Sequence, residues 1–459
     1  MLDSVCFKFL LALFISTMSL NSTCRGQEGT KQTNARIAEF SGPTMGTRFT
    51  VKIYDPPSFE DDVRLEVDAK LRHINDLMST YLPNSEISRF NQSDSVDWFP
   101  VNLETASVVT FAQAISEKTG GAFDITVGPL VNAWSFGPAE RKRVVPTQKE
   151  IDEILSGVGY KKLEVKLNPP ALRKTEPNLE IDLSSIAKGY AVDQVVLLLN
   201  RLGAENVFVE IGGEVCTSGS KGGQPWQVGI QVPDIDQDAV LIAQPLNTQP
   251  KTDQAMATSG DYRNFFEVDG KRYSHTIDPR SGFPIEHGLA SVSILSSSCM
   301  EADAWATALN VLGDQEGGKL AKSEGLSLLA VKRNKDGYTY LGNGLLQPHA
   351  DSLSEAATLR AAGSSPTASK LSTTPKKNAS WLVMLLTAAV FGIIVTGMAV
   401  GVMFGRRAIS GSCGGLANRT DADGNTSCSL CSNPSDACKE LRDRMNDENT
   451  QQNVGETGT

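Results

Sequence analysis

Residues 257–309 constrain the fold of this chain more than any other stretch. Two strand-like segments within it, Phe265–Val268 and Lys271–Ile277, flank the dipeptide Asp269-Gly270. Asp-Gly between two such segments is the strongest short-range signal for a β-hairpin turn. A further apolar alternation covers residues 289–295 and leads into a helical pattern. The sequence therefore predicts a hairpin, a strand and a helix in succession.

The predicted hairpin and helix carry side chains that suit a metal ion. His275 and Asp278 follow the second strand into a loop, and we expect the helix to begin near Met300. Asp303 and Thr307 stand four residues apart, so they share one face of that helix. A carboxylate and a hydroxyl near this loop could hold a hard cation such as Mg2+. From spacing alone, the simpler interpretation is that Asp303 is an N-terminal charge partner of the helix.

The other elements indicate an α+β fold. Helical spacing of apolar residues covers 60–78 and about 104–118, and strands are expected at 207–211 and 226–232. Hairpins occur without regular βαβ alternation, which favours an α+β class over a parallel sheet. The 459 residues leave room for more than one domain, and a net charge of −10 gives no support to a nucleic-acid partner.

Residues 178–200 predict an anion site. We expect a strand to end at Asp182, a turn at Ser184-Ser185, and a long helix to open at Lys188-Gly189. Backbone N–H groups at a helix start, with a lysine beside them, suit a phosphate group. The spaced glycines of a Walker A loop are missing, so this is a different kind of phosphate site.

A glycine pair after the helix at 104–118 allows two interpretations. Gly120-Gly121 either ends the helix, as a C-cap and turn, or lets the backbone approach a ligand. In the second case Phe123 and Asp124, which follow directly, would offer stacking and hydrogen bonding.

The two ends of the chain indicate export and a membrane anchor. Residues 1–24 resemble a signal peptide, with lipidation of Cys24 as an alternative. Residues 381–404 contain no charged side chain and are long enough for one tilted transmembrane helix. Residues 348–380 have the composition of a flexible linker. We therefore expect residues 38–347 on the periplasmic side of the cytoplasmic (inner) membrane and residues 405–459 in the cytoplasm.

Seven motifs in order over residues 38–347 give the chain a specific resemblance to the ApbE-type FAD:protein FMN transferase family. They are PTMGT (43–47), GAFD (121–124), DLSSIAKGYAVD (182–193), IGGE (211–214), TSGDY (258–262), HTIDPRSGFP (275–284) and ADAWATAL (302–309). The resemblance implies a compact α+β domain that moves FMN from FAD to a threonine or serine hydroxyl of a target flavoprotein, with Mg2+, and releases AMP. Acceptor-like motifs are lacking here, so the target is another protein.

The resemblance also assigns site residues. The expected FAD contacts are Met45, Tyr81, Ala122, Phe123, Asp124, Asp182, Lys188 and His275. The expected Mg2+ ligands are the Asp303 carboxylate, the Thr307 hydroxyl and the backbone carbonyl of Ser185. The expected catalytic groups are Asp303, Lys188 and His275, and either His275 or Asp278 could help to deprotonate the acceptor hydroxyl. Two alternatives lack transfer: a protein that keeps the site only to hydrolyse or bind FAD, and a non-catalytic assembly factor.

The C-terminal segment is similar to NqrM, a small membrane protein. The similarity covers residues 397–418 and continues to four cysteines, Cys413, Cys428, Cys431 and Cys438. It implies a role in maturing the Na+-translocating NADH:quinone reductase, through iron bound by these thiols. Four thiolates suit a soft metal or an iron–sulfur site, with zinc or unliganded thiols as alternatives.

Overall fold

The computed structural model describes residues 36–361 except for 58–59, 139–142, 232, 234–239, 247–253, 262–263 and 336. The chain divides into two units, 1–367 and 368–459, and all described residues belong to the first. The predicted signal peptide, the span at 381–404 and the four tail cysteines lie outside the described residues. Within the described part, no helix is long and apolar enough to cross a membrane.

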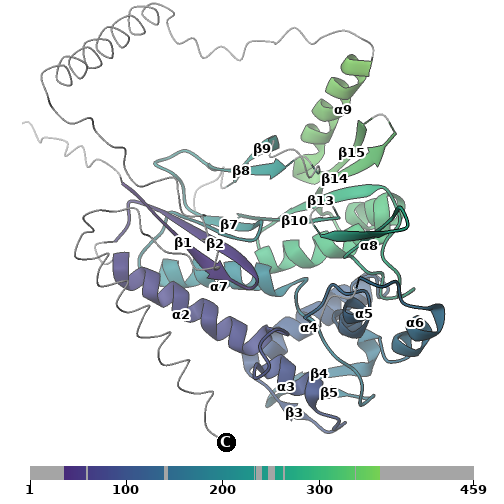
Figure 1. Ribbon diagram of the computed structural model, residues 1–459. Helices are drawn as coiled ribbons and strands as arrows, with labels where there is room; N and C mark the ends of the chain where they lie inside the picture. Colours follow the sequence, from purple (N-terminus) through teal and green to yellow (C-terminus); the bar gives the residue numbers. More distant parts are fainter. Residues whose placement is uncertain are drawn as a thin grey trace, which may run out of the picture. The chain divides into compact units, whose positions relative to one another are not determined.

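An antiparallel sheet of eight strands forms the centre of the domain (Figure 1). Every neighbouring pair of strands in it runs antiparallel, which confirms the α+β class. In spatial order the strands are β1 (Ile37–Thr44), β2 (Thr47–Tyr54), β6 (Val207–Ile211), β7 (Glu214–Ser218), β10 (Gln254–Gly260), β13 (Leu289–Ser296), β14 (Ser327–Asn334) and β15 (Gly337–Asn343).

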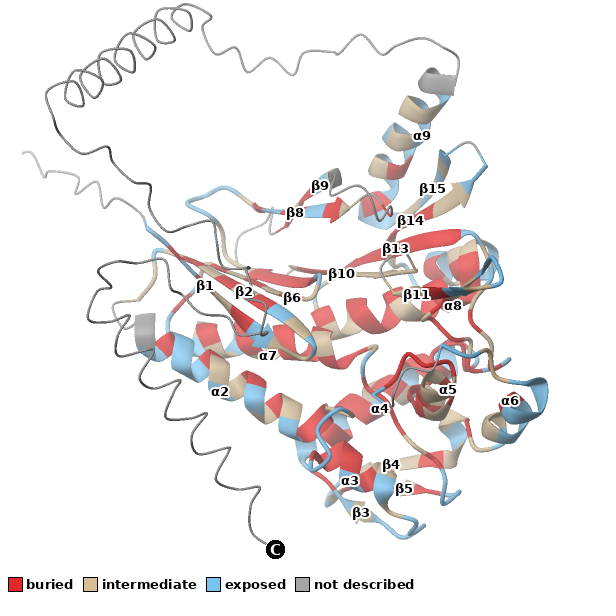
Figure 2. Cartoon of the chain, in the orientation of Figure 1, coloured by how far each residue is buried: buried red, intermediate tan, exposed pale blue. Residues whose placement is uncertain are grey.

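Helices cover one face of this sheet. Helix α7 (Ala187–Arg201) packs on β6 and β7, and α8 (Cys299–Ser323) packs on β10 and β13. Helix α2 (Glu60–Met78) lies outside α7, and Figure 2 shows that the faces turned toward the sheet are the buried ones. The opposite face carries the hairpin of β8 (Trp226–Gln231) and β9 (Val240–Leu246). Because both faces are covered, β13 buries seven of its eight residues.

The predicted linker at 348–380 is wrong for its first part, because α9 (Gln347–Ala361) is helical. Ala350 is buried, and Leu353 packs with it against a cluster that includes Trp226 and Leu329. The Ser, Thr and Ala content that indicates a tether also permits a helix, and apolar burial against the sheet selects the helix.

A second layer, which holds most of the remaining elements, packs beside α7 and α8. It contains α3 (Glu86–Gln92), β3 (Phe99–Pro100), α4 (Leu103–Lys118), α5 (Gly128–Ala133), α6 (Gln148–Leu155), β4 (Leu163–Leu167), β5 (Pro170–Lys174), β11 (Phe265–Val268) and β12 (Lys271–Ser274), with 3-10 turns at Ile125–Val127 and Tyr160–Lys162; a third, Gly344–Leu346, precedes α9. Strands β11 and β12 form the predicted hairpin around Asp269-Gly270. Their aromatic residues pack with Trp134 and Phe136 into a separate core cluster.

The predicted strand ending at Asp182 is not present. Residues 179–183 have no regular secondary structure and join no sheet. Instead, the side-chain amide of Asn91 donates to the Ile181 carbonyl and accepts from the Ile181 N–H, both at 2.9 Å. The Asp182 N–H donates to the Ile125 carbonyl at 2.7 Å. A side chain far away in the sequence therefore replaces the neighbouring strand, which no local pattern could reveal.

Candidate active site

One cavity of about 470 Å³ gathers every residue that the sequence analysis assigned to FAD or to Mg2+. Its lining includes Met45, Tyr81, Ala122, Phe123, Asp124, Asp182, Ser185, Lys188, His275, Asp303 and Thr307. These residues come from β1–β2, the second layer, α7 and α8, and only the folded chain brings them together. A neighbouring cavity of about 700 Å³ shares Met45, Tyr81, Asp182 and Lys188 with the first.

Three residues that line the cavity carry oxygen atoms of the kind that a small hard cation binds. Asp303 and Thr307 lie one turn apart on α8, and Ser185 lies in the turn before α7. Asp303 is buried, and its Oδ2 accepts a hydrogen bond from the Gly189 N–H at 3.0 Å. No three side chains of His, Cys, Asp or Glu come together as a metal group in the described part of the chain. A metal here would therefore depend on one carboxylate with a hydroxyl and a carbonyl, which Mg2+ tolerates because it keeps several waters.

Lys188 lies between two buried carboxylates. Its Nζ is 2.8 Å from Glu214 Oε1 and 3.7 Å from Asp303 Oδ1. Burial disfavours the ammonium charge, but the two carboxylates outweigh it and raise the pKa of Lys188 above its ordinary value. Burial also raises the pKa of Glu214 to about 7, against the opposing effect of Lys188. We regard both groups as charged, because a 2.8 Å contact between them is that of an ion pair.

Glu214 was missed as a site residue by the sequence analysis, although its motif was noted. It is 3% exposed, lines the cavity and follows the tight Gly212-Gly213 turn between β6 and β7. A glutamate directly after a glycine pair was the available signal, but the sequence does not show that it is buried beside Lys188.

The structure separates the two candidate bases. The Nδ1 of His275 is 2.9 Å from the Asn264 carbonyl oxygen, which can only accept, so Nδ1 carries the proton. The Nε2 lone pair is then available, and burial lowers the pKa of His275, which favours the neutral ring. Asp278 does not line the cavity, and its carboxylate binds the Arg280 guanidinium at 2.9 and 3.0 Å. His275 is therefore the better placed base.

The glycine turn after α4 has the geometry of a helix C-cap, and the residues that follow it line the cavity. Gly120 and Gly121 have positive φ angles of 59° and 85°, and the Gly121 N–H donates back to the Ser116 carbonyl, as in a helix C-cap. Ala122, Phe123 and Asp124 then line the cavity.

Two of these lining residues offer a ligand less than expected. Phe123 is 2% exposed, so most of its ring packs in the core rather than facing a ligand. The Asp124 carboxylate already accepts hydrogen bonds from the Thr126 N–H and hydroxyl and from the Tyr160 N–H. Part of its task is therefore to fold the turn.

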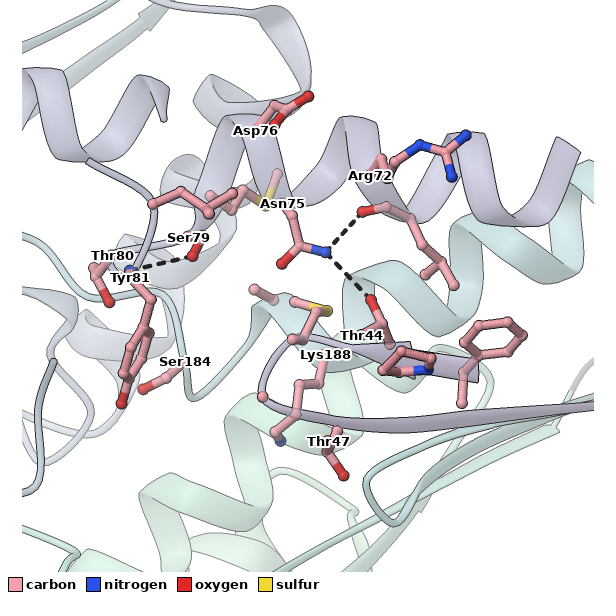
Figure 3. Close-up of a pocket in the computed structure, with 18 of the residues that line it drawn as sticks. Thr44, Thr47, Arg72, Asn75, Asp76, Ser79, Thr80, Tyr81, Ser184 and Lys188 are labelled. Carbon is pink, nitrogen blue, oxygen red and sulfur yellow. Dashed lines mark hydrogen bonds between the residues drawn. The ribbon is translucent and has the colours of Figure 1, made fainter. Parts of the chain in front are cut away.

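Met45 and Tyr81 line both cavities. Met45 occupies the β1–β2 turn with φ of 48°, and Tyr81 leaves 63% of its surface exposed. Figure 3 shows Tyr81 beside Ser184, and Asn75 of α2 pointing toward Thr44 of the hairpin. The Asn75 amide donates to the Thr44 hydroxyl at 3.2 Å, which ties the hairpin to α2.

Other polar groups in the cavity had no predicted role. Thr258 and Ser259 at the end of β10 line it, within the TSGDY motif. Asn310, buried on α8, donates to the Ser259 hydroxyl oxygen at 3.2 Å. The sequence assigns no role to this motif, because it does not show which face of the strand carries these hydroxyl groups.

Comparison with known proteins matches two family models to separate parts of the chain. The model described as the ApbE family matches residues 45–330. The model described as "(Na+)-NQR maturation NqrM" matches residues 402–451, which include the four tail cysteines and lie outside the described residues.

Curated proteins and solved structures agree with the first match. The FAD:protein FMN transferase of Vibrio cholerae is 43% identical over 318 residues, which cover 68% of this chain and 93% of that protein. The Escherichia coli K12 protein of the same name is 37% identical over 306 residues. The aligned residues cover 66% of this chain and 86% of that protein.

Solved flavin transferases share the fold. The flavin transferase ApbE from Vibrio cholerae has a TM-score of 0.62 at 40% identity, covering 68% of this chain and 99% of that one. The apo flavinyl transferase ApbE of Pseudomonas stutzeri gives 0.61 at 36% identity, covering 70% and 97%. With a family match over more than half its length and these relatives, the chain belongs to the ApbE family of FAD:protein FMN transferases and carries a C-terminal segment that matches NqrM.

Proposed function

We propose that this FAD:protein FMN transferase is Mg2+-dependent, releases AMP, and modifies a threonine or serine of the Na+-translocating NADH:quinone reductase. The observation that carries the proposal is the cavity in which Asp303, Thr307 and Ser185 lie beside Lys188 and His275. Cutting a pyrophosphate is mostly a matter of neutralising and positioning charge, and these are groups of that kind.

The metal would be held by the oxygens of Asp303, Thr307 and Ser185. When bound, it would neutralise charge on the pyrophosphate. The chain's own contribution is to orient these oxygens. Gly189 fixes one Asp303 oxygen through its N–H, and α8 holds Thr307 on the same face.

The transfer step needs a base and a stabilised leaving group. The acceptor hydroxyl oxygen bonds to the phosphorus of the FMN half, and its proton passes to Nε2 of His275. The bond between that phosphorus and the bridging oxygen breaks, and AMP leaves with the electron pair. The Lys188 ammonium at the start of α7 stabilises the charge of the departing phosphate.

FAD would extend along both cavities. Met45, Tyr81, Asp182 and Lys188 border each of them, so a long dinucleotide can pass between them. We place the flavin ring at the larger cavity, against Tyr81. An aromatic residue that is 63% exposed and lines both cavities offers a stacking face for a planar ring.

The second family match supports the proposed acceptor, whereas the location and the tail metal are proposed from the sequence of the two ends of the chain. A segment matching NqrM in the same chain supports a role in maturing the reductase named in that description. We place the transferase domain on the periplasmic side of the cytoplasmic membrane, one transmembrane helix at 381–404, and the tail in the cytoplasm. Cys413, Cys428, Cys431 and Cys438 would bind iron there.

Hydrolysis is the competing function, because water can replace the acceptor hydroxyl in the same site. The test mixes the full-length chain with FAD, Mg2+ and a candidate reductase subunit. We expect a fluorescent covalent flavin on the subunit in a denaturing gel, and one AMP released per flavin attached. Chelation by EDTA should stop both. Release of AMP and free FMN without labelling of the subunit would contradict transfer and support FAD hydrolysis.

A further inference from the structure

Glu214 has two carboxylate oxygens with different surroundings. Oε1 accepts from Lys188 Nζ at 2.8 Å, whereas Oε2 is buried and has no hydrogen-bond partner among the described residues. The side chain keeps only 5% of its surface exposed and borders the cavity. Leaving a carboxylate oxygen buried and unpartnered is costly, so the ion pair of Oε1 with Lys188 must offset that cost.

Two carboxylates lie near the Lys188 ammonium group. It lies 2.8 Å from Glu214 and 3.7 Å from Asp303, and both carboxylates are almost fully buried. In such a poorly solvated place an ammonium moves to whichever carboxylate attracts it most. Asp303 Oδ2 is already bonded to the Gly189 N–H, so Oδ1 is the oxygen for which Lys188 and a metal ion would compete.

We propose that Glu214 is a positioning residue that holds the Lys188 ammonium off Asp303 and so keeps the Asp303 carboxylate available to a divalent cation. This assignment rests on the proposed function, since it takes Asp303 as a metal ligand. Without the Glu214 charge, Lys188 pairs with Asp303 and becomes an internal competitor of the metal. With it, the ammonium stays beside the site, where the phosphate of the substrate arrives.

The simpler interpretation is a buried ion pair that only stabilises the fold. The two differ in one measurable respect. A structural pair changes the free energy of unfolding, while an internal competitor changes metal affinity in a way that depends on Lys188. Neutralising Glu214 also removes a negative charge near the metal, so a single variant cannot separate these effects.

A double-mutant cycle separates them. Mn2+ binding to the full-length protein without FAD is measured by electron paramagnetic resonance for the wild type, Glu214→Gln, Lys188→Met and the double variant. We expect Glu214→Gln to weaken Mn2+ binding about tenfold, as for one lost buried charge interaction. We expect Lys188→Met to strengthen Mn2+ binding more in the Glu214→Gln background than in the wild type. The two strengthening factors should differ about tenfold.

Additive effects of the two substitutions would overturn the proposal, as would unchanged Mn2+ affinity in Glu214→Gln. The matched control is Glu86→Gln, another buried glutamate, whose oxygens accept from the Asn102 N–H and the Thr105 hydroxyl. It should lower the melting temperature without changing Mn2+ affinity.

Two further outcomes are informative. If Glu214→Gln fails to fold, Lys188→Met keeps the proposal open to contradiction, because weaker Mn2+ binding than in the wild type would contradict a competing lysine. If the wild type itself binds no Mn2+, the metal assignment of the proposed function fails instead, and the two failures are thereby distinguished.

Discussion

At the scale of single residues, Asp303 links the contact between α7 and α8 to the proposed metal site. Its Oδ2 is fixed by the Gly189 N–H at 3.0 Å, and its Oδ1 faces Lys188 and the cavity. A carboxylate held by one oxygen presents the other in a defined direction, which is what a metal ligand requires.

Asp303→Ala should abolish Mg2+-dependent transfer while FAD binding largely remains. Asp303 is not among the residues proposed to contact FAD, and the flavin ring is placed at the larger cavity, which Asp303 does not line, so only the metal is lost. We expect a fall in kcat of at least about 10²-fold, as when a group that stabilises transition-state charge is removed. FAD binding is checked by quenching of flavin fluorescence. Asp314→Ala on the same helix, which breaks an ion pair with Lys332, is the control. Near-normal activity in Asp303→Ala would refute the metal site.

The pKa of His275 determines the expected fall of activity in acidic solution. Burial lowers its pKa below the usual 6.5, so the ring stays neutral through neutral pH and becomes protonated only in more acidic solution. Activity should therefore rise with pH and reach its plateau below about pH 6.5.

His275→Gln should remove this acid limb and lower kcat by about 10²–10⁴-fold, the contribution of a general base. The measurement is kcat against pH for both proteins, with the acceptor in excess. An acid limb that persists in His275→Gln would assign the titration to another group.

At the scale of elements, the junction of α7 with α8 places the metal ligands. Asp193 on α7 accepts hydrogen bonds from the Cys299 N–H at 2.8 Å, the Met300 N–H at 3.0 Å and the Ser298 hydroxyl at 2.8 Å, and so caps α8. One turn earlier, a Cβ on Gly189 would lie 2.3 Å from the Cys299 carbonyl oxygen, so only glycine allows this approach. Asp303 begins the next turn of α8 from that fixed end.

Asp193→Ala should weaken metal binding through the position of α8. Loss of a helix cap costs about 0.5–2 kcal/mol of stability, and the displaced helix start should also lower Mn2+ affinity several-fold. Asn102→Ala removes the cap of α4, where Asn102 accepts from the Glu104 N–H, and serves as the matched control. Equal stability loss in both variants with a metal defect in neither would reduce Asp193 to an ordinary cap.

The helices and strands also show which parts of the fold could be predicted from the sequence. The hairpin at Asp269-Gly270 and the helix at 60–78 were predicted within a few residues, because each carries a complete local pattern. The strand at 178–182 and the linker beginning at 348 were wrong, because Asn91 in one case and the sheet face in the other decide the structure from far away. Glu214 was missed for the same reason, since its partner Lys188 is distant in sequence.

At the scale of the whole molecule, two family matches meet in one chain. The transferase match covers residues 45–330 and the NqrM match residues 402–451. One polypeptide with both would bring flavin attachment and the handling of a metal to the same membrane complex. We propose, from the predicted order of segments, that the two parts lie on opposite sides of the membrane.

Cysteine labelling in intact cells tests that arrangement. Cys216 and Cys299 are buried in the transferase domain, so an impermeant maleimide should not reach them in the folded protein. Any strong label from outside must then come from the N-terminal or tail cysteines. A variant with serine at positions 413, 428, 431 and 438 isolates the tail contribution. We expect these four thiols to react only after the cells are opened, because the cytoplasm keeps thiols reduced and the membrane shields them. Label that appears in intact cells and disappears in the serine variant would place the tail outside, and purification of the tail with zinc under iron-replete conditions would exclude the iron role.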